Sequence, residues 1–420
     1  RNILWPSVVR WYAKSSGTTN DKSKFLPVTP EILKGCHYKG GFDTVSIYLQ
    51  NNPDSHFFAS KGLILGGSHS PSPLNRNAHC GDLSAVLLQN LNPLVNLIRV
   101  PDKKIILMDE WESKIKAIVE STWKTDVNSL SGVPSWMLVL IKAVLQKTGS
   151  EYLTDVWPNM EVFFHGGISF EPYRDQYKAL IPSDRMHYME TYNASEGFFG
   201  LQDNPEEHSL LLMIDYSVFY EFIPINEVGE EHPTVLPLEA VEVGKNYAMV
   251  ITTSGGLWRY QIGDTVRFTS LYPHKFVISG RTKNFINAFG EELMVDNADK
   301  AISRVCRQTG AKVKEYTAAP LFMLDKAKGR HQWMIEFEKM PPSLDDFASL
   351  LDKTLQQLNS DYEAKRYKEI SLQPLEIRVA REGTFYEWLR RKGKLGGQHK
   401  IPRLSNDRTF IEELGKICDL

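Results

Sequence analysis

The stretch MHYMETYNASEG, from Met186 to Gly197, says most about the fold of this chain. Its first half predicts a buried strand, and its second half predicts a polar loop at the end of that strand. An earlier stretch, MEVFFHGG from Met160 to Gly167, predicts another buried strand that ends in a glycine turn. Open α/β sheets bind ligands at the carboxyl edge of their strands. The end of the Met186–Gly197 stretch is therefore a candidate ligand site.

The loop in ETYNASEGFFG, from Glu190 to Gly200, carries side chains suited to a nucleotide. Tyr192 could stack on a base and Ser195 could donate a hydrogen bond to a phosphate. Glu196 could hold Mg²⁺, which prefers one or two carboxylates together with phosphate oxygens. The alternative is a capped loop ahead of two packed phenylalanines.

The rest of the chain alternates between helical and strand patterns, which predicts a mixed α/β protein. Strand pairs are expected in residues 209–225 and 246–268. Helices are expected over Asp109–Ser121, Ser135–Lys147, Glu171–Leu180, Asp296–Thr309 and Leu344–Asn359.

The length of 420 residues predicts more than one domain. The clearest boundary is Ser279-Gly280-Arg281-Thr282-Lys283, which separates a strand-rich stretch from a new α+β run. We therefore expect an N-terminal domain over residues 1–278, a hinge over 279–285 and a C-terminal domain over 286–420. The chain begins with Arg1 rather than methionine, so we expect further residues ahead of it.

The composition argues against some classes of binding partner. Lysine plus arginine (49) nearly balances aspartate plus glutamate (51), which argues against nucleic acid or an anionic membrane as the main partner. The four cysteines form no C-x-x-C pair, so we expect neither a zinc site nor a disulfide framework. We expect instead that the protein lies in the reducing cytoplasm. No apolar run approaches the roughly 18–20 residues of a membrane span.

Ser15–Lys24, SSGTTNDKSK, has the hydroxyls and lysines of a phosphate-binding loop. It is not a Walker loop, which needs G-x-x-x-x-G-K-[ST]. Hydroxyls, backbone N–H groups and lysine charge can hold phosphate without it, and Gly17 lets the backbone approach closely. A polar surface turn is the alternative.

Later segments add weaker signals. Asp264, in GGLWRYQIGD, could accept hydrogen bonds from ribose hydroxyls, with Arg281 assisting, although the default interpretation is a turn for Asp264 and a surface position for Arg281. Lys400, in GGQHKIPRL, could be carried into a site by a glycine hinge, or could lie in an exposed loop. The sequence contains no G-x-S-x-G, H-E-x-x-H or G-x-G-x-x-G motif, so serine hydrolase, zinc protease and dinucleotide chemistries lack support.

These segments follow one another in a specific order. KSSGTTNDKSKFLPVT (14–29), ETYNASEGFFG (190–200), GLWRYQIGDTVRF (256–268), GRTKNFINAFGEEL (280–293) and QHKIPR (398–403) are spread over essentially the whole chain. In this order the sequence resembles the auxin-responsive GH-three family of acyl acid amido synthetases, within the adenylate-forming superfamily. It is more similar to the bacterial-type branch than to the plant enzymes, and Asp21 stands where plant members usually have glycine.

The resemblance implies a ligase with a large N-terminal domain of mixed β/α sheets and a small β-barrel, followed by a smaller, mobile α+β C-terminal domain. Such enzymes join a small-molecule carboxylic acid to ATP, with Mg²⁺, to give an acyl-adenylate and pyrophosphate. The C-terminal domain then rotates, and the amine of an amino acid attacks to form an amide. We expect a cytoplasmic monomer, and the charge balance argues against a nucleic-acid or membrane partner.

The resemblance also implies roles for individual residues. Lys400 would bridge the substrate carboxylate and the α-phosphate, Glu196 would carry Mg²⁺, and Lys283 would lie at the hinge. The β- and γ-phosphates would be held by Ser15, Ser16, Gly17, Thr18, Thr19 and Lys24, and Ser195 would also contact phosphate. Adenine and ribose would be held by Gly166, Gly167, Tyr192, Asp264 and Arg281. Trp136 and Met137, in SGVPSWMLVLIK, are candidate walls of the acid pocket, although an apolar stripe at helical spacing also indicates a core.

Two alternatives stay open. An acyl-CoA ligase would share the adenylation half-reaction and differ only in its acceptor. A non-catalytic acyl- or nucleotide-binding homologue would be expected to lack Glu196 or Lys400, and both are present.

Overall fold

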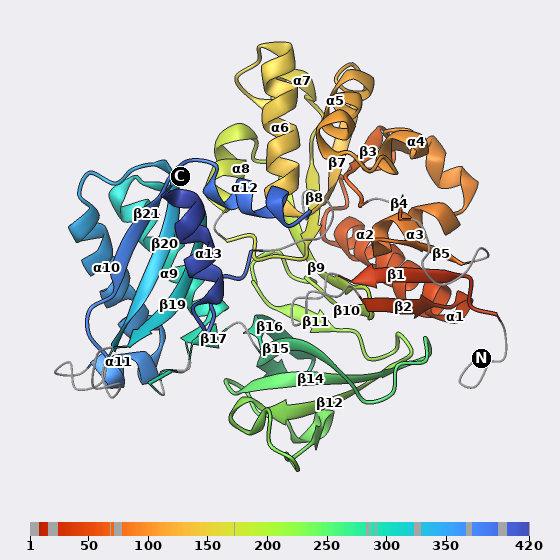
Figure 1. Ribbon diagram of the computed structural model, residues 1–420. Helices are drawn as coiled ribbons and strands as arrows, with labels where there is room; N and C mark the ends of the chain where they lie inside the picture. The colour runs from red at the N-terminus through yellow and green to blue at the C-terminus, as the bar shows by residue number, and fades with distance from the viewer. Residues whose placement is uncertain are drawn as a thin grey trace.

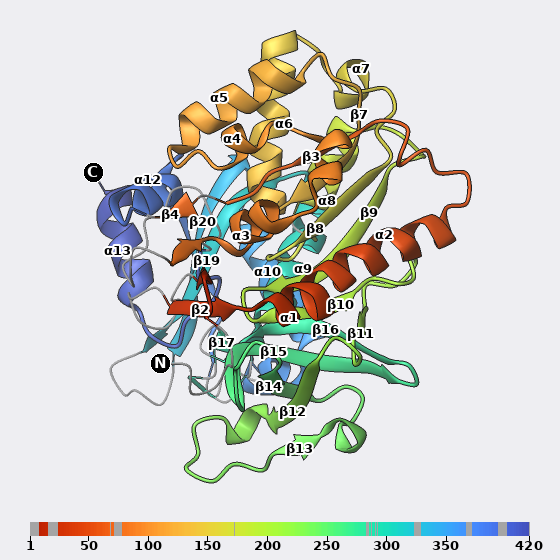
Figure 2. The same ribbon diagram turned by 90° about the vertical axis from the view of Figure 1, so that its right-hand side faces the viewer.

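The computed structural model describes residues 8–15, 24–67, 69–70, 78–171, 173–282, 285–286, 288–289, 291, 293–322, 329–366, 372–393 and 401–419. We call the described residues up to Thr282 the N-terminal part and those from Phe285 the C-terminal part. Figure 1 shows the C-terminal part, in blue, beside the N-terminal part. In Figure 2 the N-terminal part extends from the helices at the top to a strand-rich region at the bottom.

A 12-stranded sheet forms the centre of the N-terminal part. Six antiparallel strands form one end of it. In sheet order these are β13 (Leu236–Pro237), β12 (Val218–Pro224), β14 (Asn246–Thr253), β15 (Tyr260–Leu271), β16 (His274–Arg281) and β11 (Leu210–Leu212). The order continues with β10 (Gly197–Leu201), β9 (His187–Ala194), β8 (Val162–Gly166), β7 (Val127–Gly132), β3 (Lys61–Ile64) and β6 (Arg99–Val100). Pairing is parallel from β9 to β6 and antiparallel from β9 to β13.

A second, four-stranded sheet has the order β2 (Lys24–Val28), β1 (Trp11–Ser15), β5 (His79–Gly81) and β4 (His69–Ser70). The helices of the N-terminal part are α1 (Pro30–Ile32), α2 (Lys39–Asn51), α3 (Leu83–Asn90), α4 (Lys103–Ile106), α5 (Trp111–Thr122), α6 (Pro134–Thr148), α7 (Leu153–Val156) and α8 (Arg174–Leu180). The sequence sets both ends of α6. Pro134 occupies its first turn, and Gly149 ends it in a left-handed conformation with φ of 69°.

The C-terminal part has its own sheet and core. The sheet contains β19 (Lys312–Phe322), β20 (Gly329–Lys339) and β21 (Glu376–Ala380), and a short hairpin joins β17 (Phe285–Ile286) to β18 (Leu293–Met294). Its helices are α9 (Val295–Thr309), α10 (Leu344–Leu358), α11 (Ser360–Arg366), α12 (Thr384–Arg391) and α13 (Thr409–Cys418). The fully buried Trp333 and Tyr316 stack at the centre of one core cluster, with ring centroids 5.5 Å apart.

The mixed α/β prediction is confirmed, and the five expected helices all form. One detail differs. The strands within residues 209–225, β11 and β12, do not pair with each other, because β11 lies between β10 and β16 while β12 pairs with β13 and β14. The small β-barrel implied by the resemblance is not assigned to particular strands; among the described residues, the antiparallel strands β11 to β16 continue the 12-stranded sheet.

The first residues of the expected hinge, 279–281, belong to strand β16. Gly280 and Arg281 pair with Thr265 and Asp264 of β15, so β16 continues as far as Arg281. Lys283 lies outside the described residues. Within the part of the chain that the structure describes, no helix combines the length and the apolar character needed to cross a bilayer.

Shortening a buried leucine of the parallel strands should weaken the N-terminal part. Leu130 of β7 is 0% exposed and lies in register with Leu63 and Phe163. We expect Leu130→Ala to lower the free energy of unfolding by about 2–5 kcal/mol, because it leaves a cavity. Urea unfolding measures this. Leu97→Ala is the control, since Leu97 is 64% exposed and should change stability by only about 0.5 kcal/mol. Equal effects of the two changes would contradict the placement of Leu130.

Candidate functional site

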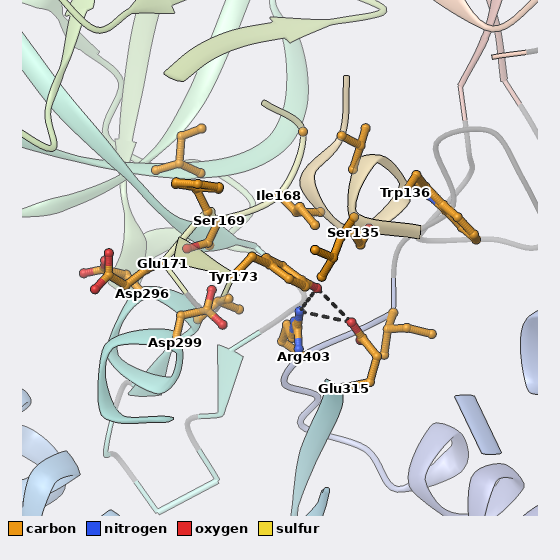
Figure 3. A pocket seen from close by; sticks show the side chains of 18 of the residues that line it. Ser135, Trp136, Ile168, Ser169, Glu171, Tyr173, Asp296, Asp299, Glu315 and Arg403 are labelled. Atoms are coloured by element: carbon orange, nitrogen blue, oxygen red, sulfur yellow. Dashed lines mark hydrogen bonds and ion pairs between the residues drawn. The ribbon is translucent and has the colours of Figure 1, made fainter. Parts of the chain in front are cut away.

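A cavity of about 960 Å³ lies between the N-terminal and C-terminal parts. Side chains of both parts line it, and Figure 3 shows several of them from close by. The N-terminal part contributes Trp136, Gly167, Glu171, Tyr173, Glu190, Tyr192, Ser195, Glu196, Asp264 and Arg281, and the C-terminal part contributes Asp296, Asp299, Glu315 and Arg403.

The change of direction at β9 places Ser195 and Glu196 at the cavity. β8 and β9 are parallel neighbours with Gly166 opposite Thr191, so their carboxyl ends meet at one edge of the sheet. β10 then returns antiparallel from Gly197, opposite Ala194. Ser195 and Glu196 form the tight turn between β9 and β10, which is the position that the sequence predicted for a ligand-binding loop.

Tyr192 and Arg281 both bind Asp264. The Tyr192 hydroxyl donates to Asp264 Oδ2 at 2.5 Å, and Arg281 Nε lies 2.8 Å from Asp264 Oδ1. Arg281 can do this because it lies opposite Asp264 in the β15–β16 register. The Tyr192 ring packs edge-on against Phe199 and Phe276 and the residue is 6% exposed, so what it chiefly offers the site is its hydroxyl.

Glu196 lies in a field that favours a bound cation. Burial raises its pKa to about 7, and the negative charge of Asp264 adds to this effect, while Arg281 and Lys24 lower the pKa. Lys24 lies nearby on β2, where its ammonium donates to the Tyr260 hydroxyl at 3.1 Å. No group of three or more metal-binding side chains occurs among the described residues. The residues present fit Mg²⁺ held by a single carboxylate and phosphate oxygens.

Gly166, the last residue of β8, and Gly167, which follows it, are required for different reasons. A Cβ on Gly166 would lie 2.3 Å from the Thr191 carbonyl oxygen, so the close approach of β9 excludes a side chain there. Gly167 lines the cavity and has φ of 85°, a conformation that favours glycine.

One end of the cavity is apolar. Trp136 lines it and packs edge-on against Trp111, with ring centroids 4.5 Å apart, and Val133, Leu138 and Val139 lie beside it. Met137, which we predicted as a second wall, is 0% exposed and packs in the core instead. The helical turn directs its side chain away from the cavity.

The segment that follows Gly167, residues 168–171 and 173–174, contacts the C-terminal part at alternate positions. We call it the bridging loop. Ser169 donates to the Asp299 carboxylate of α9. The Glu171 carboxylate accepts from Ser303 and pairs with Arg307, both at 3.4 Å.

The third contact of the bridging loop is a buried cluster. The Tyr173 hydroxyl donates to Glu315 Oε1 at 2.9 Å and accepts from Arg403 Nη2 at 3.1 Å (Figure 3). The Arg403 guanidinium also lies 4.4 Å from the centre of the Tyr316 ring. The backbone on either side of Arg403 is held on β19, because Thr317 donates to the Pro402 carbonyl and Ala318 to that of Arg403.

Several predicted residues lie outside the described part of the chain. These are Ser16, Gly17, Thr18, Thr19 and Lys400, while Ser15 is described only as the last backbone position of β1. Sequence reasoning did not single out Tyr173, Glu190, Glu315 or Arg403. Glu190 and Arg403 stand inside quoted motifs, but Tyr173 and Glu315 are 142 residues apart and no sequence pattern connects them.

Comparisons with family models, curated proteins and solved structures all match this chain to the same family. Models of the GH3 family match along its length: the N-terminal domain at residues 1–186, the central domain at 211–281 and the C-terminal domain at 296–409. Indole-3-acetic acid-amido synthetase GH3.4 of Arabidopsis thaliana is 28% identical over 93% of this chain and 68% of its own length.

Two further matches have related names. The 4-substituted benzoates-glutamate ligase GH3.12 of Arabidopsis thaliana is 27% identical over 74% of this chain and 59% of its own length. The solved structure of the GH3.15 acyl acid amido synthetase aligns with a TM-score of 0.76 at 18% identity, over 98% of this chain and 81% of that one.

The raised pKa of Glu196 predicts a pH effect on stability in the absence of nucleotide and Mg²⁺. A carboxyl whose pKa rises to about 7 on folding contributes stability below its ordinary pKa, and that contribution is lost as the pH rises toward 7. Glu196→Gln removes this loss. We therefore expect the melting temperature of the variant to rise relative to that of the parent between about pH 5 and about pH 8. A difference in melting temperature that stays constant with pH would contradict the burial of an ionisable Glu196.

Proposed function

Because the chain belongs to the GH3 family, we propose that it joins a small-molecule carboxylic acid to an amino acid through an acyl-adenylate made from ATP. The observation that carries this proposal is the gathering of Glu196, Asp264 and Arg281 at the carboxyl edge of β9, in a cavity whose other end is apolar. The polar end suits a nucleotide and the apolar end suits the body of an organic acid.

In the first half-reaction, a carboxylate oxygen of the acid would attack the α-phosphorus of ATP and pyrophosphate would leave. We assign the ribose to Asp264, which Tyr192 and Arg281 hold in place, and the base to the space beside Gly166 and Gly167. The triphosphate would then lie toward Ser195 and Glu196, with Lys24 and the residues of 15–19 around it. Mg²⁺ held by Glu196 would offset phosphate charge.

Lys400 would bridge the acid and the α-phosphate. Cancelling charge as nucleophile and phosphorus approach is typically the largest catalytic contribution of an active site. In the second half-reaction the amine nitrogen of an amino acid would attack the acyl carbon, and AMP would leave. The amine would lose a proton as the amide forms.

We propose that the C-terminal part is a mobile domain that turns about residues near Lys283 between the two half-reactions. Three contacts of the bridging loop connect the two parts, through Ser169, Glu171 and Tyr173. These contacts would have to break for the rotation to occur. We further propose a cytoplasmic monomer; a reducing compartment fits Cys36, Cys80, Cys306 and Cys418, none of which is in a disulfide.

Exchange of pyrophosphate into ATP tests the first half-reaction. Across a panel of carboxylic acids, at least one should stimulate exchange, and Lys400→Ala should slow it by about 10²–10³-fold, as loss of a transition-state donor does elsewhere. Lys392→Ala is a matched control, because Lys392 pairs with Glu413 away from the cavity and should leave the rate unchanged. No exchange with any acid would favour a non-catalytic binding protein, and full activity of Lys400→Ala would contradict the role of that lysine.

The acceptor distinguishes an amide-forming ligase from an acyl-CoA ligase. With an acid that supports exchange, we expect product to form when amino acids are added and not when coenzyme A is added. Mass spectrometry of the products measures this. A thioester with coenzyme A would overturn the proposed acceptor while leaving the adenylation step intact.

The bridging loop should matter for one half-reaction more than for the other. Tyr173→Phe removes a hydroxyl that joins Glu315 and Arg403 and so disfavours the arrangement seen here. We expect the half-reaction that uses this arrangement to slow by about tenfold, the effect of one buried hydrogen bond, while the other keeps its rate. Pyrophosphate exchange and aminolysis of a supplied acyl-adenylate separate the two. Tyr272→Phe, at a residue that is 92% exposed, is the control. Equal slowing of both steps would contradict the rotation.

A further inference from the structure

Resting on the ligase function proposed above, we propose that helix α12 of the C-terminal part forms one wall of the pocket for the organic acid. Tyr386 and Leu389 of α12 would then help to select the acid, together with Trp136 and Val139 of α6. Because α12 belongs to the C-terminal part, the acid would be enclosed only while the two parts keep the arrangement seen here.

Two helices from different parts of the chain present side chains to the cavity. Trp136 and Val139, three residues apart on α6, line it from the N-terminal part. Tyr386 and Leu389, three residues apart on α12, line it from the C-terminal part. Residues three apart lie on the same face of a helix, so each helix turns one side toward the cavity.

Trp136 places α12 at the apolar end of the cavity. It packs against the cluster around the parallel strands and also against a second cluster, formed by α12, α13 and the C-terminal sheet, that contains Leu389. Figure 1 accordingly shows α12 beside the lower end of α6. In Figure 3 Trp136 lies on the opposite side of the view from Glu171 and Asp296. The wall that α12 forms is therefore distant from these carboxylates.

Polar contacts hold this wall against the N-terminal part. The Tyr386 hydroxyl donates to Glu112 Oε1 of α5 at 3.3 Å, and Lys142 of α6 pairs with Glu338 of β20 at 3.2 Å. Because the Tyr386 hydroxyl is bound to α5, its ring is the part that a molecule in the cavity would meet.

Some apolar surface at this wall is exposed to solvent. Val139 is 44% exposed and Tyr386 is 37% exposed, although both line the cavity. Removing apolar surface from water is favourable, and ligand pockets are lined mainly by apolar and aromatic side chains. The apolar body of an acid would cover these two side chains, with its carboxylate directed toward the polar end of the cavity.

The arrangement that brings α12 to the cavity also brings the segment after Lys400 there. Ile401 lines the cavity and packs against the cluster that contains Leu389. Arg403, two residues further on, contacts Tyr173 at the same cavity. The wall would therefore act in the half-reaction that we assign to Lys400, and formation of the acyl-adenylate is the step to measure.

Exchange of pyrophosphate into ATP, driven by acids of graded length, tests this wall. The probes are the ω-phenyl acids from benzoic acid to phenylpentanoic acid, and kcat/KM is measured for each. Tyr386→Ala removes a ring from the wall and should raise kcat/KM for the longer acids relative to the shorter ones. We expect a change of about tenfold, the low end of what one methylene group is worth in an apolar pocket. Leu389→Ala should shift the preference in the same direction.

Two controls separate the wall from its surroundings. Tyr386→Phe keeps the ring but loses the hydrogen bond to Glu112, so it should keep the preference of the parent. Leu414→Ala loosens the cluster that contains Leu389, at a residue that is 0% exposed and is not among the described residues that line the cavity. It should therefore lower stability without changing the order of preference among the acids.

The outcomes distinguish this wall from the ligase function. An unchanged order of preference in both Tyr386→Ala and Leu389→Ala would overturn the wall while leaving the adenylation reaction in place. A shift of the same size in Leu414→Ala would also overturn it, because the shift would then come from a loosened core. A parent that shows no exchange with any acid would overturn the proposed function together with this wall.

Discussion

The pairing of β9 with a parallel strand on one side and an antiparallel strand on the other is the constraint on which the rest of the structure depends. A parallel neighbour requires a crossover connection, here the bridging loop and α8, whereas an antiparallel neighbour needs only a tight turn, here Ser195 and Glu196. Both connections leave from the same edge of the sheet. The loop that reaches the C-terminal part and the turn that carries the half-buried Glu196 therefore lie at one cavity.

Two of the carboxylates at this cavity are each paired with an arginine of the same part of the chain. Asp264 is neutralised by Arg281 and further held by Tyr192, all within the N-terminal part. Glu315 is neutralised by Arg403 within the C-terminal part, and the Tyr173 hydroxyl donates to it from the N-terminal part. Other ion pairs join the two parts, namely Glu171–Arg307, Arg267–Asp296 and Lys142–Glu338. Separating the parts would break these pairs, but it would leave Asp264 and Glu315 each with its own arginine, and an unpaired buried ion is the more expensive outcome.

The sequence predicted elements well wherever local pattern decides them. The helix expected over Ser135–Lys147 forms as Pro134–Thr148, because its proline and glycine signals lie at its ends. The helix expected from Glu171 begins only at Arg174, because Glu171 and Tyr173 are committed to distant partners. The order of β11 and β12 in the sheet, the burial of Met137 and the Tyr173–Arg403 contact depend on residues far apart in the chain. Periodicity carries no information about such partners, whereas the Glu196 turn could be predicted because β9 and its turn are contiguous.

Successive residues of the bridging loop contact the hydrophobic core and helix α9 in turn. Ile168 and Phe170 pack on the hydrophobic core of the parallel sheet, while Ser169 and Glu171 between them bind α9. As in a β-strand, successive side chains of this segment point alternately toward the core and toward α9. Replacing any one residue alters one contact, but inserting or deleting a single residue would turn the polar side chains into the core and the apolar ones toward α9. We therefore expect related proteins with this fold to keep the length of this loop more strictly than its amino-acid sequence.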